Sequence, residues 1–217
     1  MNCYYCKRSC IKKGKRKNGT QKYRCCCCKK YQQEAYVRKG WHPCLNKEIK
    51  KHIIESCGIR SIARLLEISC TTVIKRILFI AQNINKPVMA MGKAYEADEL
   101  KTYCGKKTCE RWITYAIRTD TKEPVDFRIG RRTKKNIGAV IKTLLLSKAK
   151  KIYTDGLDLY RYLIPPKIHG RQWYKINHIE RKNLNLRMHL KRLGRKTICF
   201  SKSDAMLEAC VKIYFWG

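Results

Sequence analysis

The 217-residue sequence predicts an α/β protein in which a cysteine-rich unit and a helical segment precede a domain built on a mixed sheet. Three observations predict this class. Seven of the 14 cysteines lie in the first 28 residues, apolar residues recur at helical spacing after residue 45, and strand-like segments begin at Tyr95. We therefore expect four parts along the chain. Their boundaries are 1–40, 41–86, 87–94 and 95–217.

The charge of the chain indicates a polyanionic partner. Fifty lysines and arginines against 16 acidic residues give a net charge of +34. Such a field repels itself unless a polyanion neutralises it, and nucleic acid gains affinity from counterion release. A membrane-surface protein or a ribosomal-type binder is the alternative. Because no apolar run approaches the length of a membrane span and the N-terminus lacks a signal sequence, we expect a cytoplasmic, nucleoid-associated protein without a membrane partner.

The first part, residues 1–40, is too poor in aliphatic residues to form a hydrophobic core. It contains two C-x2-C pairs, Cys3 with Cys6 and Cys25 with Cys28, and two such pairs can complete a tetrahedral zinc site that replaces the missing core. The residues between the pairs resemble a hairpin with a turn at Asn18-Gly19. We predict a zinc ribbon. The run of four cysteines at 25–28 leaves the ligand register open, and a Cys-rich tail is the alternative.

The second part, residues 41–86, has helical spacing throughout. The stretch 59–82 predicts a short helix, a turn near Ile68 and a second helix that begins with Thr71 and Thr72, which are good helix caps. This order is typical of a helix-turn-helix unit, whose second helix enters the major groove of DNA. An ordinary helical hairpin is the alternative. The residues expected to read DNA are Thr71, Thr72, Lys75 and Arg76.

A linker with Pro and Gly, residues 87–94, separates this part from the predicted sheet. Three strand patterns follow at 95–103, 111–119 and 124–130, then a helical pattern at 133–148 and a short strand that ends at Asp155-Gly156. This order matches the opening of a ribonuclease-H-like domain, although periodicity alone leaves other mixed α/β folds open.

Three acidic residues stand out in this last part. Asp98 lies within a strand, where an unused charge is costly, and Asp155 ends a strand, where active sites of α/β proteins collect. Glu180 is the only acid between Leu159 and Ser203. Carboxylates brought together from separate elements could hold two Mg²⁺ ions for phosphoryl transfer. The alternatives are an exposed edge residue for Asp98, a turn or helix cap for Asp155, and an intrahelical pair with Arg187 or Lys182 for Glu180.

The first acidic ligand has rivals in Glu96 and Glu99, and Glu96 is the better one because it shares the face of Asp98. His169 and His178 also lie near these acids. We interpret both histidines as structural or phosphate-contacting residues, not as metal ligands.

Several stretches suggest a family. Besides the two cysteine pairs, they are "ADEL", "TY" and "GKK" within 97–107, "RW" at 111–112, "YTDG" at 153–156, "LIPP" at 163–166, "IERKNLNLR" at 179–187 and "KRLGRKTICFSKS" at 191–203. In these stretches the chain resembles the Asp-Asp-Glu transposases of the insertion-sequence-one family over almost its whole length. It departs from that family at Lys101, where an aromatic is usual, and at Cys104, where an aliphatic is usual.

The resemblance implies a zinc ribbon, a helix-turn-helix and a ribonuclease-H-like catalytic domain whose triad is Asp98, Asp155 and Glu180. It implies binding of the element's terminal inverted repeats, Mg²⁺-dependent strand cleavage and strand transfer. The partners would be double-stranded DNA, as element ends and as target, and further copies of the chain in a homodimer or larger synaptic complex. Catalytic-domain residues expected to contact DNA are Arg181, Asn183, Arg187, Lys191, Arg192, Arg195 and Lys196.

Two other functions remain open from the sequence. One is a non-catalytic DNA-binding repressor, or a decayed copy, that keeps the zinc ribbon and helix-turn-helix. The other is a nuclease of the same fold that cuts DNA without joining it.

Overall fold

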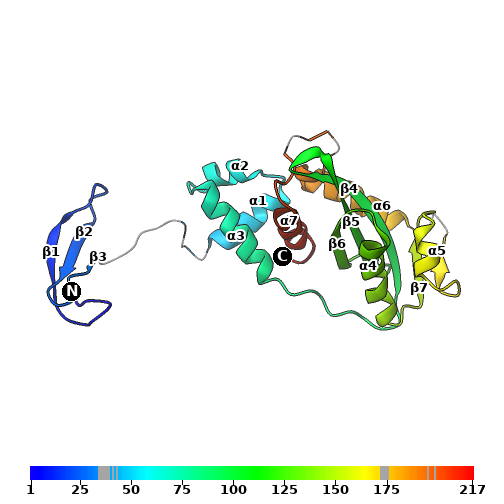
Figure 1. The fold of residues 1–217 in the computed structure, drawn as a ribbon, viewed down its shortest axis with the longest axis horizontal. Coiled ribbons are helices and arrows are strands. Elements are labelled where there is room, and N and C mark those ends of the chain that lie inside the picture. Colours follow the sequence, from blue (N-terminus) through cyan, green and yellow to red (C-terminus); the bar gives the residue numbers. More distant parts are fainter. Residues whose placement is uncertain (34–39, 41, 43, 172–175, 195, 198) are drawn as a thin grey trace. The chain divides into compact units, whose positions relative to one another are not determined.

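The fold is described from a computed structural model of the chain, for residues 1–33, 40, 42, 44–171, 176–194, 196–197 and 199–217 (Figure 1). The chain divides into two compact units, Met1–His42 and Pro43–Gly217. Within the described residues, no helix combines the length and apolar character needed to cross a bilayer.

The first unit is a small antiparallel sheet. Its strands are β1 (Cys10–Lys15), β2 (Gln21–Cys25) and β3 (Tyr31–Gln33), in the order β1-β2-β3. The expected hairpin is present, and Gly19 has the positive φ (80°) that a tight turn requires and that glycine adopts without steric cost. The third strand was not expected, because three residues carry too little alternation to be recognised.

The second unit begins with the helices α1 (Leu45–Ile54), α2 (Ile59–Leu65) and α3 (Cys70–Gln82). The third helix starts slightly earlier than predicted, because the Ser69 side chain accepts a hydrogen bond (3.0 Å) from the backbone N–H of Thr72 and caps the helix. The apolar faces of α1 and α3 pack against the last helix, α7 (Asp204–Trp216), and α2 packs against α3, all within one hydrophobic cluster (Figure 1). The sequence pattern did not predict α7.

The sheet of this unit has five strands in the order β6-β5-β4-β7-β8. The strands β4 (Ala94–Cys104), β5 (Lys106–Arg118) and β6 (Pro124–Gly130) form an antiparallel meander. The short strands β7 (Lys151–Thr154) and β8 (His169–Gly170) run parallel to β4. This mixed sheet contains each predicted strand, and its topology is compatible with a ribonuclease-H-like, integrase-type fold.

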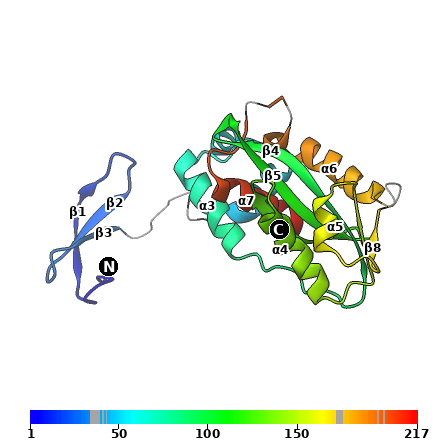
Figure 2. The same cartoon turned by 45° about the vertical axis from the view of Figure 1, so that its right-hand side comes forward.

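Helices cover both faces of the sheet (Figure 2). The side chains of Leu100, Ile113 and Tyr115 belong to the hydrophobic cluster that includes α6 (Asn177–His189) and α7. On the other face, Tyr95 and Ala97 pack with α4 (Lys134–Leu146) and α5 (Leu159–Leu163). A 3₁₀ turn, Lys191–Leu193, follows α6. Because side chains alternate along β4, Asp98 lies on the face of α6 and Glu99 on the face of α4.

Candidate active site

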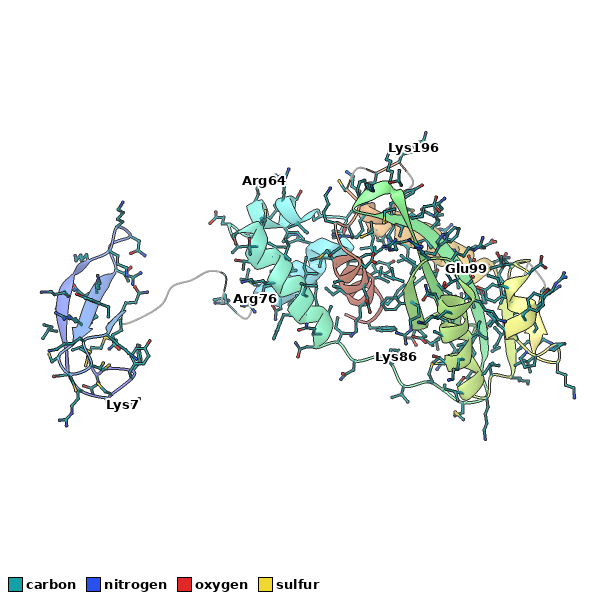
Figure 3. All side chains as sticks on the ribbon, in the orientation of Figure 1. Lys7, Arg64, Arg76, Lys86, Glu99 and Lys196 are labelled. Atoms are coloured by element: carbon teal, nitrogen blue, oxygen red, sulfur yellow. The ribbon has the colours of Figure 1, made fainter. Side chains whose placement is uncertain are left out.

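The pairing of β4 with β7 brings Asp98 and Asp155 together. The parallel register ends at Ala97 opposite Thr154, so the next residue on each strand is one of the two aspartates. Carboxylate oxygens of Asp98, Glu99 and Asp155 all lie within 4.8 Å of one another. Figure 3 labels Glu99 where this group lies on the sheet. We call Asp98, Glu99 and Asp155 the acidic cluster.

Asp98 is the half-buried member of the acidic cluster that contacts α6. Its carboxylate accepts hydrogen bonds from the backbone N–H of Glu99 (2.7 Å) and from Nδ2 of Asn183 (2.6 Å). Burial, reinforced by the negative charges of Asp155 and Glu99, outweighs these bonds and raises the pKa of Asp98 to about 7. A carboxylate that resists ionisation beside two others is a position where added positive charge would be favourable.

Glu99 contributes a third, buried carboxylate from the opposite face of the strand. It forms an ion pair with Nη2 of Arg132 (3.0 Å) and accepts a hydrogen bond from the hydroxyl of Tyr160. Burial raises the pKa of Glu99 despite these donors. Glu99 reaches Asp155 because β7 ends at Thr154, so the edge of β4 lies open beside both Asp98 and Glu99.

Glu96, the rival that the sequence favoured over Glu99, has another role. It is fully buried, and one carboxylate oxygen accepts the backbone N–H of Ile179 (2.9 Å) while the other contacts Nδ1 of His178 (2.8 Å). Both partners lie in the first turn of α6, where backbone N–H groups lack intrahelical acceptors. Glu96 therefore fastens the start of α6 to β4.

Glu180 lies in this first turn of α6, and the structure does not bring its carboxylate into the acidic cluster. Its side chain is exposed and forms no hydrogen bond or ion pair with any described residue, so the alternative of an intrahelical pair is also absent. One turn further along, Asn183 contacts Asp98. Residues three apart on a helix have Cβ atoms about 5–6 Å apart, so Glu180 lies one helical turn from the residue that contacts Asp98, outside the acidic cluster.

Two further residues of α6, Asn183 and Arg187, hold the helix in place. Asn183 accepts a hydrogen bond from the hydroxyl of Tyr115 (2.9 Å) while it donates to Asp98. Arg187 donates to the backbone carbonyls of Leu193 (2.7 Å) and Lys101 (3.2 Å). The sequence predicted DNA contacts for both residues, and in this structure both side chains are used within the protein.

The remaining residues predicted to contact DNA differ in exposure. Arg192 is buried and donates to Oγ of Ser201 (2.9 Å). Arg76 is half-buried and donates to Oδ1 of Asn46 (3.3 Å), and Thr72 is half-buried. Arg195 lies outside the described residues. Exposed side chains belong to Thr71, Lys75, Arg181, Lys191 and Lys196.

Among the residues that the structure describes, neither His169 nor His178 belongs to a cluster of side chains that could hold a metal ion. His169 forms a hydrogen bond through Nε2 with Oγ1 of Thr154 (2.8 Å), and His178 contacts Glu96. Burial, together with the nearby positive charge of Arg171, lowers the pKa of His169. These contacts agree with the structural interpretation of both residues.

In the first unit, the sulfur atoms of Cys3, Cys6, Cys25 and Cys28 lie within 4.8 Å of one another. The separations are 3.5 Å between Cys3 and Cys28 and 3.4 Å between Cys6 and Cys25. Tetrahedral zinc with Zn–S bonds of about 2.3 Å places sulfurs about 3.8 Å apart, so this donor set fits the ion. Burial opposes ionisation of Cys25, but hydrogen bonds from the backbone of Cys28 and from Cys6 outweigh it and lower the pKa to about 6.

The fifth nearby cysteine, Cys10, does not belong to this set of four. Burial and the neighbouring Cys25 and Cys3 raise the pKa of Cys10 to about 11, so its thiol stays protonated at neutral pH. The register left open by the sequence therefore has a geometric preference for Cys25 and Cys28, because Cys26 and Cys27 are exposed.

Comparisons with known proteins agree on one family. A family model described as "IS1 transposase" matches residues 93–215. "Insertion element IS1 protein InsB" of Shigella sonnei is 40% identical over 119 residues, which cover 55% of this chain and 91% of that protein. "Insertion element IS1 9 protein InsB" of Escherichia coli (strain K12) is also 40% identical over 119 residues, covering 55% of this chain and 71% of that protein.

Among solved structures, a similar chain occurs in the "CryoEM structure of simian T-cell lymphotropic virus intasome in complex with PP2A regulatory subunit B56 gamma". The TM-score is 0.38 at 14% sequence identity, over 75% of this chain and 66% of that chain.

Proposed function

This chain belongs to the IS1 transposase family, and we propose on that basis that it is a DNA transposase, which binds the terminal inverted repeats of an insertion sequence and catalyses metal-dependent strand cleavage and strand transfer. The observation that carries the proposal is the convergence of Asp98 and Asp155 at the end of β7. These two carboxylates are 57 residues apart in the sequence and follow paired positions on neighbouring strands. Together they form the core of a site suited to hard divalent cations.

The residues that would hold Mg²⁺ are Asp98 and Asp155, with Glu180 as the third ligand and Glu99 as a buried neighbour. The donor set fits, since these oxygen ligands suit the ion and the raised pKa of Asp98 marks a local excess of negative charge. A pair of such ions, when bound, supplies activation of the attacking oxygen and stabilisation of the leaving oxygen.

The protein's own contribution is to orient these ligands. Asn183 and the backbone N–H of Glu99 fix the rotation of the Asp98 carboxylate. Glu96 and Asn183 together fasten α6 to β4, with Glu180 between the two attachment points. The exposed Glu180 side chain can then reach the acidic cluster by rotation about its own bonds, and the exposed cations of α6 and the following turn bind the phosphates of the DNA.

We propose that residues 1–40 form a zinc ribbon on Cys3, Cys6, Cys25 and Cys28, that 41–86 form a helix-turn-helix with α3 as the recognition helix, that 87–94 form the linker, and that 95–217 form the catalytic domain. The support is the four-sulfur cluster for the first and the exposure of Thr71 and Lys75 at the start of α3 for the second. Synapsis of two element ends requires a homodimer or a larger assembly.

The test uses purified full-length protein with labelled DNA that carries the element's own ends, with Mg²⁺ present and with cleaved and joined products scored separately. We expect both products from the parent, and neither from Asp98→Asn, Asp155→Asn or Glu180→Gln, with DNA affinity retained. The matched control is Glu208→Gln, an exposed acid on α7, which should leave both products unchanged.

The outcomes separate the rival functions. Nicked DNA without joined products would favour a nuclease of the same fold. Tight binding of the ends without any cleavage by the parent would favour a DNA-binding repressor or a decayed copy.

A further inference from the structure

A second site lies near the acidic cluster, where β5 begins and β6 ends. The surface there is hollowed into an open cavity of about 660 Å³, within the range of pockets that bind small molecules. Its lining includes the cations Lys106, Arg131 and Arg132 and the aromatic side chain of Trp112. We propose that this cavity binds one unpaired nucleotide of the DNA strand, with its base stacked at Trp112 and its phosphate held by Arg131 and Lys106.

The cavity carries positive charge that the protein does not neutralise. Its acid, Glu110, is paired with Lys101, and its Arg111 is paired with Asp204 through Nε at 2.8 Å. Lys106 and Arg131 are exposed, and their side chains have no hydrogen bond or ion pair with any described residue. Two unpaired cations at the rim of a cavity can together bind an anion of the size of a phosphodiester.

The aromatic component selects an unpaired base. Trp112 is half-buried, and the guanidinium of Arg132 lies over its ring, 4.6 Å from the ring centre. Indole and guanidinium planes are the surfaces on which splayed-out bases stack. A base inside a duplex has both faces covered by its neighbours, so it cannot use such a surface. The cavity therefore fits a nucleotide that has left the helix.

The cavity is coupled to the acidic cluster through Arg132. The guanidinium that covers Trp112 also forms the ion pair with Glu99. Trp112 pairs with Lys101 in the β4–β5 register, and Lys101 lies on the same face of the sheet as Glu99 and two residues from it, about 7 Å along β4. On the proposed function, the phosphates next to the bound nucleotide lie beside the acidic cluster. The cavity would therefore hold the DNA strand that is cut or joined.

The experiment measures binding without catalysis, in magnesium-free buffer, so that its failure is separable from failure of the cleavage assay. The probes are a short oligothymidylate with one central 2-aminopurine and a duplex of equal length. The variants are Trp112→Leu, which removes the stacking surface, Trp112→Phe, which keeps one, and the double change Arg131→Gln with Lys106→Gln. The control is Lys142→Gln, an exposed cation on α4 away from the cavity.

We expect Trp112→Leu to weaken single-strand binding about tenfold and to abolish the quenching of 2-aminopurine, while Trp112→Phe retains most of both and duplex affinity changes less than about twofold. The double cation variant should weaken single-strand binding and lower the slope of log affinity against log salt concentration by about one. Because both cations are exposed, this variant remains informative if Trp112→Leu misfolds. Unchanged single-strand affinity in the folded variants, or equal losses for duplex and single strand, would overturn the proposal.

Discussion

Replacing Asp98 by Asn should stabilise the protein in the absence of magnesium while it abolishes cleavage. The pKa of Asp98 is raised from 3.8 to about 7, first by burial and then by the charges of Asp155 and Glu99. Between about pH 4 and pH 7, Asp98 is therefore protonated in the folded protein and ionised in the unfolded chain. Its free energy of unfolding falls as the pH rises through this window, and the full penalty is present above about pH 7.

The magnitude follows from the gap between the two pKa values. A difference of about 3 corresponds to about 4 kcal/mol at neutral pH and above. Asp98 accepts two hydrogen bonds, from Asn183 and from the Glu99 backbone, and Asn can accept only one of them. The lost hydrogen bond reduces the stabilisation by about 1 kcal/mol. The net gain of Asp98→Asn is therefore about 2–3 kcal/mol at about pH 8, or about 5–10 °C in Tm, and it disappears below about pH 4.

The assay is urea and thermal unfolding of the full chain across this pH range in magnesium-free buffer. Asp120→Asn is the control of opposite sign, because a hydrogen bond from Arg118 lowers the pKa of Asp120, so that variant should lose stability at neutral pH. Added Mg²⁺ should raise the Tm of the parent and leave that of Asp98→Asn unchanged. A gain that does not vary with pH, or no gain at about pH 8, would refute the account of Asp98 as a carboxylate held against its own ionisation.

Three further predictions concern the elements that support the site. Glu96→Ala should cost about 1–3 kcal/mol in urea unfolding because it leaves buried N–H donors of α6 unpaired, and it should raise the Mg²⁺ concentration needed for half-maximal cleavage, whereas Glu96→Gln keeps the acceptor and should recover most of both. Cys28→Ser should lower the zinc content measured by mass spectrometry of the native protein, and Cys10→Ser should leave it unchanged, so equal zinc in both variants would refute the ligand set. Ser69→Ala should lower the stability by about 1 kcal/mol through loss of the α3 cap, and an unchanged urea midpoint would contradict that.

Much of this architecture could be predicted from sequence because local patterns determine it. The strand-like segment 95–103 and the short segment that breaks off at Asp155-Gly156 each predict a strand, and adjacent parallel strands have their carboxyl ends at the same edge of the sheet. The spacing of the cysteine pairs restricts which sulfurs can meet, and the structure brings together Cys3, Cys6, Cys25 and Cys28. These features require no knowledge of distant contacts.

Other features depend on tertiary contacts that no local pattern records. The last helix, α7, is buried along most of its length between α3 and the sheet, so it lacks the polar face that marks a surface helix. Glu99 was ranked below Glu96 because alternation places it on the other face from Asp98. That argument applies to a strand paired on both sides, and it fails where β7 stops and leaves the edge of β4 open.

The position of Glu180 follows from how α6 is attached. Glu96 binds the helix at Ile179, and Asp98 binds it at Asn183, so two contacts to β4 enclose the residue. A slide of α6 by one turn, about 5.4 Å, would break both contacts and leave the buried carboxylate of Glu96 without its donors. These contacts hold the helix in place, so on the proposed function Glu180 approaches the acidic cluster through its own side-chain torsions. On the proposed function, a position that reaches inward from this helix favours a long carboxylate side chain, which is a physical reason for a glutamate here where the two strands carry aspartates.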